Sequence, residues 1–110
     1  YPAGELKHGT ISLVEKDTPV ISIITNNDIK DKTISNVKEV IARGAYSVIV
    51  TDLDIDPSII NDLIKVPSIN TFFKPIISII PLQLLAYYVA KCNGCDIDKP
   101  RNLAKSVTVE

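Results

Sequence analysis

Two short apolar runs rich in β-branched residues lie in the first half of the chain. One covers residues 20–25 (V-I-S-I-I-T), and the other covers residues 46–50 (Y-S-V-I-V). Short runs that are apolar on both faces are typical of central parallel strands. A shorter apolar run at residues 63–66 predicts a third strand. The pattern therefore predicts a small parallel β-sheet.

The segment between the first two runs predicts a helix. Asn27 is the expected cap, with Asp28 and Asp31 in the first turn, where acidic side chains are favoured. Helical spacing gives this segment one apolar stripe, which consists of Ile29, Ile34, Val37, Val40 and Ile41. A strand, a helix and a second strand in this order form a βαβ unit with parallel neighbours.

The end of this helix has its own signals. Glu39 and Arg43 are four residues apart, so we expect them to pair on the solvent side. Gly44 follows the last residue of the stripe, where a left-handed cap is wanted. The helix is therefore expected to stop just before the second strand.

The second half begins with a polar segment at residues 52–62, which predicts a loop with at most a helical turn after Pro57. From about residue 68 the chain is expected to be helical, with Pro75 and Pro81 at kinks or at a helix restart. Gly94 is expected to end this helix, and an irregular tail follows at residues 100–110. The residues expected to face inward are Leu82, Leu85, Ala86 and Val89.

Residues 75–90 carry no charge, which raises the question of a membrane span. The stretch is shorter than the roughly 20 apolar residues that cross a bilayer, and Pro75, Pro81 and Gln83 interrupt it. A buried helix is the favoured interpretation. The predicted fold class is therefore α/β, a layered fold with a parallel sheet. Three strands are few for such a sheet, so we expect an incomplete domain.

Composition narrows the function classes. The chain has 110 residues, 45% of them apolar and 23% charged, which fits one soluble globular domain at most. A net charge of -1 gives no field that attracts nucleic acid or an anionic membrane, so neither partner is expected. The chain contains no Met and no signal pattern, which predicts a fragment or processed product. With two cysteines and no disulfide framework, a cytoplasmic location is expected.

Two short motifs have weak metal-binding alternatives. Cys92 and Cys95 form a C-x-x-C at the predicted end of a helix, without the second pair that a zinc site needs. Asp52, Asp54 and Asp56 alternate as in a calcium loop, but the Gly and the closing Glu that such a loop requires are missing. We interpret the first as chance and the second as a solvated loop, and expect no metal and no organic cofactor.

Two residues carry candidate chemistry. Lys105 lies in the terminal tail, where it is either a solvated charge or a nucleophilic amine that the protein must deprotonate. His8 is either a surface residue or a proton carrier near neutral pH. Nothing else in the residues decides between these readings.

Three motifs favour the catalytic interpretation of both residues, because they resemble a known family. Residues 1–9 read Y-P-A-G-E-L-K-H-G, residues 81–87 read P-L-Q-L-L-A-Y, and residues 100–110 read P-R-N-L-A-K-S-V-T-V-E. In this order and spacing they resemble the glutamine–fructose-6-phosphate aminotransferase (isomerizing) family, the glucosamine-6-phosphate synthases. The resemblance implies a three-layer α/β/α sugar isomerase (SIS) domain of flavodoxin-like type, present as residues 1–96, and an active-site tail at residues 97–110.

The resemblance also implies roles for single residues. Lys105 corresponds to the lysine that forms an imine with fructose 6-phosphate, and His8 to the histidine that opens the sugar ring in a neighbouring subunit. Ala104 would contact the sugar through its backbone. Thr10 stands where the family usually has Pro, which puts the conformation of that loop in doubt. The tail residues that would meet the glutaminase domain or line an ammonia path are Arg101, Asn102, Leu103 and Val107.

The family resemblance leaves several catalytic parts unaccounted for, and alternative functions remain. The family's catalytic Glu, its phosphate-binding loop and its glutaminase nucleophile have no counterpart in this chain, so the 110 residues alone are expected to be inactive. The implied partners are fructose 6-phosphate, the glutaminase domain and a second subunit. The alternatives are a non-catalytic sugar-phosphate sensor on the same domain type, a structural remnant, and one of two chains that assemble into the enzyme.

Overall fold

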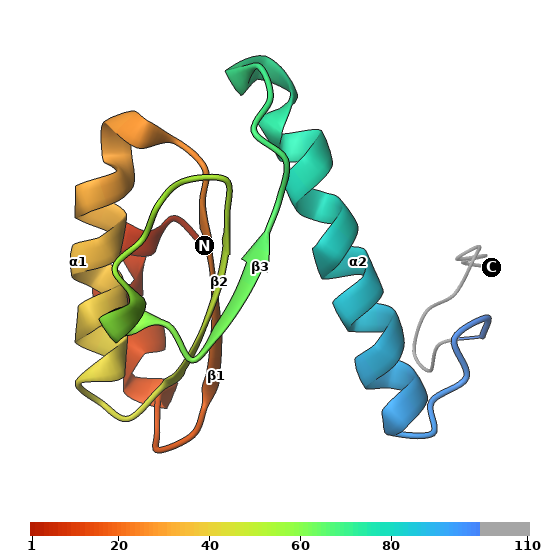
Figure 1. Cartoon of the computed structure of the whole chain (residues 1–110). Helices are drawn as coiled ribbons and strands as arrows, with labels where there is room; N and C mark the ends of the chain where they lie inside the picture. Colours follow the sequence, from red (N-terminus) through yellow and green to blue (C-terminus); the bar gives the residue numbers. More distant parts are fainter. Residues whose placement is uncertain (100–110) are drawn as a thin grey trace, which may run out of the picture. The chain divides into compact units, whose positions relative to one another are not determined.

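The computed structural model describes residues 1–99, and the chain divides into two compact units, Tyr1–Ser78 and Ile79–Glu110. The first unit holds a parallel sheet of β1 (Pro19–Ile24), β2 (Tyr46–Thr51) and β3 (Asp62–Lys65) in the order β1-β2-β3 (Figure 1). All three strands were predicted, and each end lies at most one residue from its expected position. The α/β class with a parallel sheet is confirmed.

Helix α1 (Lys30–Ile41) covers one face of this sheet as the predicted crossover helix. Its predicted stripe is confirmed, because Val37 and Val40 are buried and the neighbouring isoleucines pack against the same core. Ile29 is the exception at half exposure, since it precedes the helix proper. The core cluster beneath α1 consists of Ile24, Val37, Ile49 and Ile59.

The predicted cap of this helix is wrong by one residue. A 3₁₀ turn, η3 (Asn27–Ile29), precedes α1, and Asn26 Oδ1 accepts a hydrogen bond from the Asp28 N–H at 2.9 Å. Asn26 is therefore the residue that caps the helical segment. The extra turn shifts the start of α1 to Lys30, so that Asp31 remains in its first turn as predicted.

The end of α1 agrees with one prediction and contradicts another. Gly44 has a φ of +92°, and its N–H bonds to the Ile41 carbonyl at 2.8 Å, as expected for a left-handed cap. Glu39, however, pairs with Lys7 at 2.7 Å, not with Arg43. Lys7 belongs to η1 (Ala3–His8), a 3₁₀ segment that contacts α1 and is followed by η2 (Thr10–Leu13). Tertiary contact thus replaces the predicted pair within the helix.

Between β2 and β3 the chain makes η4 (Pro57–Ile59), which is the predicted helical turn after Pro57. After β3 it makes η5 (Thr71–Phe73) and then α2 (Lys74–Cys92). Pro81 lies inside α2 without ending it, so of the two alternatives, a kink or a helix restart, the restart is excluded. Gly94, with a φ of +67°, ends the helix as predicted, and the Cys95 N–H bonds back to the Ala90 carbonyl at 2.9 Å.

The predicted burial of α2 holds in part for the residues that are described. Leu82 and Leu85 are half-buried, but Ala86 and Val89, also expected inside, are exposed, and Ser78 is the one buried residue of the helix. The helical run Thr71–Cys92 has 22 residues and a mean hydropathy of 1.5, so it passes the length and composition test for a membrane span. The helix extends beyond the uncharged stretch at residues 75–90, because it continues through both prolines. The large apolar side chains that α2 exposes are Ile76, Ile79, Ile80, Leu84, Tyr87, Tyr88 and Val89.

Candidate functional site

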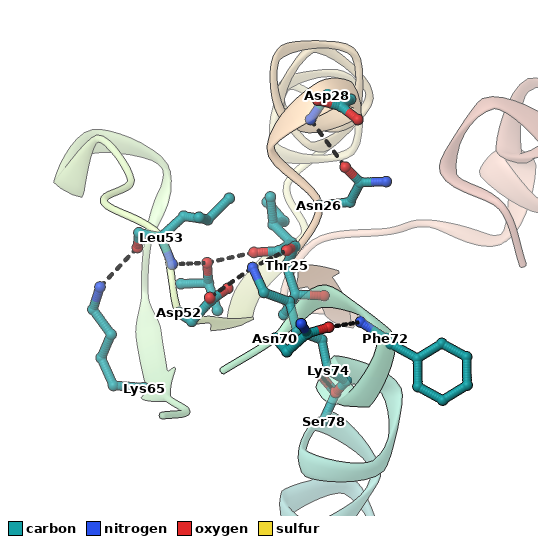
Figure 2. A network of polar contacts seen from close by, with 12 residues as sticks. Thr25, Asn26, Asp28, Asp52, Leu53, Lys65, Asn70, Phe72, Lys74 and Ser78 are labelled. Atoms are coloured by element: carbon teal, nitrogen blue, oxygen red, sulfur yellow. Dashed lines mark hydrogen bonds and ion pairs between the residues drawn. The ribbon is translucent and has the colours of Figure 1, made fainter. Parts of the chain in front are cut away.

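The carboxyl ends of the parallel strands lie at one edge of the sheet, which is the edge where α/β proteins usually bind ligands. Thr25 follows β1, and Asp52 follows β2. Asn70, which accepts a hydrogen bond from the Phe72 N–H at 3.0 Å, caps the turn that leads into α2. Figure 2 shows these segments meeting in one polar network.

Lys74 is the centre of this network. Its Nζ donates to the Thr25 carbonyl at 2.7 Å and lies 2.8 Å from Asp52 Oδ2. The Lys74 side chain is 13% exposed and that of Asp52 is 1% exposed, so this is a buried ion pair. Among residues 1–99, neither Asp52 oxygen has a hydrogen bond of good geometry, so the ion pair is the main compensation for burying the carboxylate.

The protonation of Asp52 reflects two opposed effects. Burial raises the pKa of its carboxyl, because the charged form loses water. Hydrogen bonding to Lys74 and Ser68 and the charge of the Lys74 ammonium each lower the pKa, and together they outweigh burial, so the net pKa lies below the ordinary value. Asp52 is therefore a carboxylate at neutral pH, and the pair is charged on both sides.

Two further lysines hold the loop that Asp52 opens. Lys30 Nζ donates to the Asp54 carbonyl at 2.6 Å, and Lys65 Nζ donates to the Leu53 carbonyl at 2.7 Å. The Thr51 hydroxyl donates to the carbonyl at the end of β1 and accepts from the Leu53 N–H. The start of α1, the end of β3 and the start of α2 thus all contribute a lysine to one short loop.

The prediction of a solvated loop at residues 52–62 holds for Asp54 and Asp56, which are exposed. It is wrong for Asp52, whose side chain turns inward beneath Lys74. Within residues 1–99, no group of three or more His, Cys, Asp or Glu side chains comes together as a metal site would require. Cys92 and Cys95 are free and exposed.

A second feature of the first unit is an apolar groove of about 570 Å³. It lies between the N-terminal segment and β1, where Ile21 and Ile23 are each more than 40% exposed. These side chains belong to the sheet face opposite Ile24, which packs in the core under α1. Leu6 and Leu13 line the groove from the N-terminal segment.

His8 is the one predicted catalytic residue within the described part of the chain. It is the last residue of η1 and is exposed. The segment is held from both sides, because Lys7 pairs with Glu39 and the Gly9 carbonyl accepts from both the N–H and the hydroxyl of Ser12. The turn after His8 is therefore closed although Thr10 stands in place of a proline.

The predicted tail residues lie outside the described residues, so their roles stay predictions. They are Arg101, Asn102, Leu103, Ala104, Lys105 and Val107. Sequence reasoning missed the pair of Lys74 and Asp52. A signal was present, because Asp52 comes directly after a buried strand and Lys74 directly precedes the uncharged stretch at residues 75–90.

Comparison with known proteins shows which family has this fold. The family model of the SIS domain matches residues 1–91, and the chain is therefore a member of the SIS domain family. The match extends over the whole first unit and almost all of α2.

Two similar relatives are aminotransferases with the same name. The chain is 52% identical over 114 residues to the glutamine–fructose-6-phosphate aminotransferase (isomerizing) of Clostridium perfringens and 55% identical over 112 residues to that of Legionella pneumophila. Each alignment covers 100% of this chain but 19% and 18% of the respective relative, so the chain spans about a fifth of their length. The predicted family resemblance is confirmed.

A solved structure extends this likeness to three dimensions. The C-terminal domain of glucosamine-fructose-6-phosphate aminotransferase from Francisella tularensis matches with a TM-score of 0.78 at 36% sequence identity. The match covers 90% of this chain and 29% of that one. The chain is therefore a partial SIS domain, as the small number of strands predicted.

Proposed function

We propose that this chain forms the C-terminal part of an isomerase module that makes glucosamine 6-phosphate from fructose 6-phosphate and glutamine-derived ammonia. The observation that carries the proposal is the 52% identity, over 100% of the chain, to a relative that bears this enzyme's name. The matched span includes both motif segments, at residues 1–9 and 100–110. Because the chain spans 19% of that relative, the general base, the phosphate site and the ammonia source are expected in the rest of the protein.

In the proposed reaction Lys105 supplies the nucleophile. Its neutral amine attacks the C2 carbonyl of open-chain fructose 6-phosphate, and the carbinolamine that forms loses water to give an imine. A lysine is nucleophilic only without its extra proton, so the assembled site must desolvate Nζ or place a second cation beside it. In this proposal the Ala104 backbone contacts the sugar, and the neighbouring tail residues face the ammonia path and the glutaminase domain.

His8 is the proposed acid/base for opening the sugar ring, because imidazole accepts and donates protons near neutral pH. Its exposed position at the end of η1 supports a role toward a partner surface. The proposal therefore includes a homodimer in which His8 serves the neighbouring subunit.

Helix α2 fits this proposal as part of a soluble, cytoplasmic protein. The SIS match continues through residue 91 and so includes nearly all of the apolar helix. We infer that the remainder of the domain covers its exposed apolar side chains. A membrane span would leave that part of the family match without explanation.

The test is a chimera in which this chain replaces the matching segment of the Clostridium perfringens relative. We expect the chimera to form glucosamine 6-phosphate, and borohydride to trap fructose 6-phosphate on the peptide that contains Lys105. Lys105→Arg, which keeps the positive charge, should abolish trapping, while Lys99→Arg serves as the matched control. A folded chimera that binds the sugar without trapping or turnover would support the sensor alternative instead.

A further inference from the structure

The first turn of α2 contains a buried positive charge where a helix disfavours one. Lys74 is the first residue of α2, and the N-terminal end of a helix carries partial positive charge. Its side chain is only 13% exposed, so the ammonium group has lost most of its water. Such a group is stable only when specific partners compensate for the lost hydration.

Those partners come from the ends of two strands. Lys74 Nζ donates to the carbonyl of Thr25, 49 positions away and the first residue after β1. It also lies 2.8 Å from the carboxylate of Asp52, the first residue after β2. Figure 2 shows the Lys74 side chain reaching from the helix start to both strand ends. One ammonium group thus joins three segments that are distant in the sequence.

The two charges depend on each other. The Asp52 side chain is 1% exposed, and within residues 1–99 Lys74 is the cation that pairs with it. Removing Lys74 alone would leave a buried carboxylate without a counter-charge, which is strongly unfavourable. Replacing both residues by apolar side chains of similar volume removes the charges together and restores much of the stability.

We propose that Lys74 and Asp52 are a positioning pair, which fixes the first turn of α2 on the carboxyl edge of the sheet and is required for reaction at Lys105. In this proposal both residues act through the helix and neither contacts the sugar. The segment with Lys105 follows α2 in the chain, and the proposal has the helix carry the effect of the pair to it. The link to the reaction rests on the proposed function, whereas the anchoring of α2 does not.

The anchoring is tested in the 110-residue chain by amide hydrogen exchange. Lys74→Met should speed exchange at residues 78–80, the first amides bonded within α2, by at least tenfold relative to those of β2. Lys91→Met, which removes an exposed lysine from the same helix, should change neither. Equal exchange in the Lys74→Met variant and the parent chain would overturn the anchoring.

The link to the reaction is tested by borohydride trapping in the Clostridium perfringens chimera. Lys74→Met should reduce the trapping rate at saturating fructose 6-phosphate at least tenfold, and Lys74→Arg should restore most of it. The decisive variant is Lys74→Met with Asp52→Leu. We expect it to regain the parent's melting temperature and still to trap slowly, because stability returns but the ionic anchor does not.

The outcomes separate the two proposals. If the double variant traps sugar at the parent rate, the pair only stabilises the fold and the positioning role is wrong. If the unmodified chimera folds but traps no sugar, the proposed function fails and the role at Lys105 fails with it, while the exchange measurement still decides whether Lys74 anchors α2.

Discussion

The two helices differ in what their apolar side chains contact. Helix α1 is amphipathic, and its stripe packs on the sheet with Val37 and Val40 buried. Helix α2 is longer and apolar around most of its surface, yet Ser78 is its one buried residue among those described. The difference shows that an apolar pattern predicts a helix whose side chains are covered, but the pattern does not say which element covers them. For α1 that element is within the chain, and for α2 we propose that it is the rest of the SIS domain.

The ion pairs that hold the two helices give the largest expected contrast. Lys74→Met should lower the free energy of unfolding by about 3–5 kcal/mol, because it leaves Asp52 buried and unpaired. Lys7→Met, which breaks the exposed pair with Glu39 on α1, should cost about 0–1 kcal/mol. Urea unfolding of both variants measures the difference. Similar costs would mean that the buried pair is compensated by groups other than Lys74.

A matched pair of valines tests the contrast between the helix faces directly. Val40→Ala in α1 should cost about 1.5–3 kcal/mol, since the side chain is 1% exposed and loses its burial. Val89→Ala in α2, at 51% exposure, should change the unfolding free energy by less than about 0.5 kcal/mol. Placing both changes in the Clostridium perfringens chimera sharpens the comparison. There Val89→Ala should become costly if the remainder of the domain covers α2.

The glycines that end the two helices give a smaller contrast. Gly44→Ala should cost about 1–2 kcal/mol from its left-handed backbone alone, and the new Cβ would meet Lys16 Cα at 3.0 Å. Gly94→Ala should lower the unfolding free energy only through its left-handed backbone, because nothing lies within 4 Å of its Cβ position. Thermal unfolding followed by circular dichroism compares the two variants. A larger effect at Gly94 would contradict the close approach at Gly44.

The smallest expected effect is a change in pH dependence. The pKa of Asp52 is lowered in the folded state, so the stabilisation from its carboxylate is complete above the ordinary value of 3.8 and is lost as the pH falls through the lower folded value. Asp52→Asn should therefore make stability less dependent on pH in the acid range. The pKa of Asp56 is also lowered, chiefly by its hydrogen bonds with Ser58, but Asp56 is exposed.

Unfolding measured from pH 5 down to pH 2 tests this difference between the two carboxylates. Asp52→Asn should flatten the acid limb of the stability curve more than Asp56→Asn does. The reverse order would show that the buried pair does not dominate the acid response of this edge of the sheet.

The sequence predicted the local structure well. The three strands, the stripe of α1 and the glycines that end both helices follow from periodicity and backbone preference, which depend on neighbours within a few residues. The family resemblance followed from three motifs. The predicted cap was wrong by one position. Asn26 and Asn27 have the same side chain, so the sequence alone did not show that the 3₁₀ turn begins at Asn27 and is capped by Asn26.

Contacts between distant segments could not be predicted in this way. Glu39 had a suitable partner at Arg43 in its own helix, but the fold brings Lys7 closer. Asp52 belonged to a pattern of three similar aspartates, and burial distinguishes it from the other two. Its partner Lys74 is far along the chain and reaches it only because strand ends and the start of α2 meet at one edge.

The sequence by itself thus determined the secondary-structure elements and the family, since both depend on short stretches of residues. The tertiary structure alone decided which charges are buried, which sides of α2 stay uncovered by residues 1–99, and which lysine holds the carboxyl edge of the sheet. The physical reason is that burial and ion pairing depend on distances between segments, and the pattern along the chain does not contain those distances.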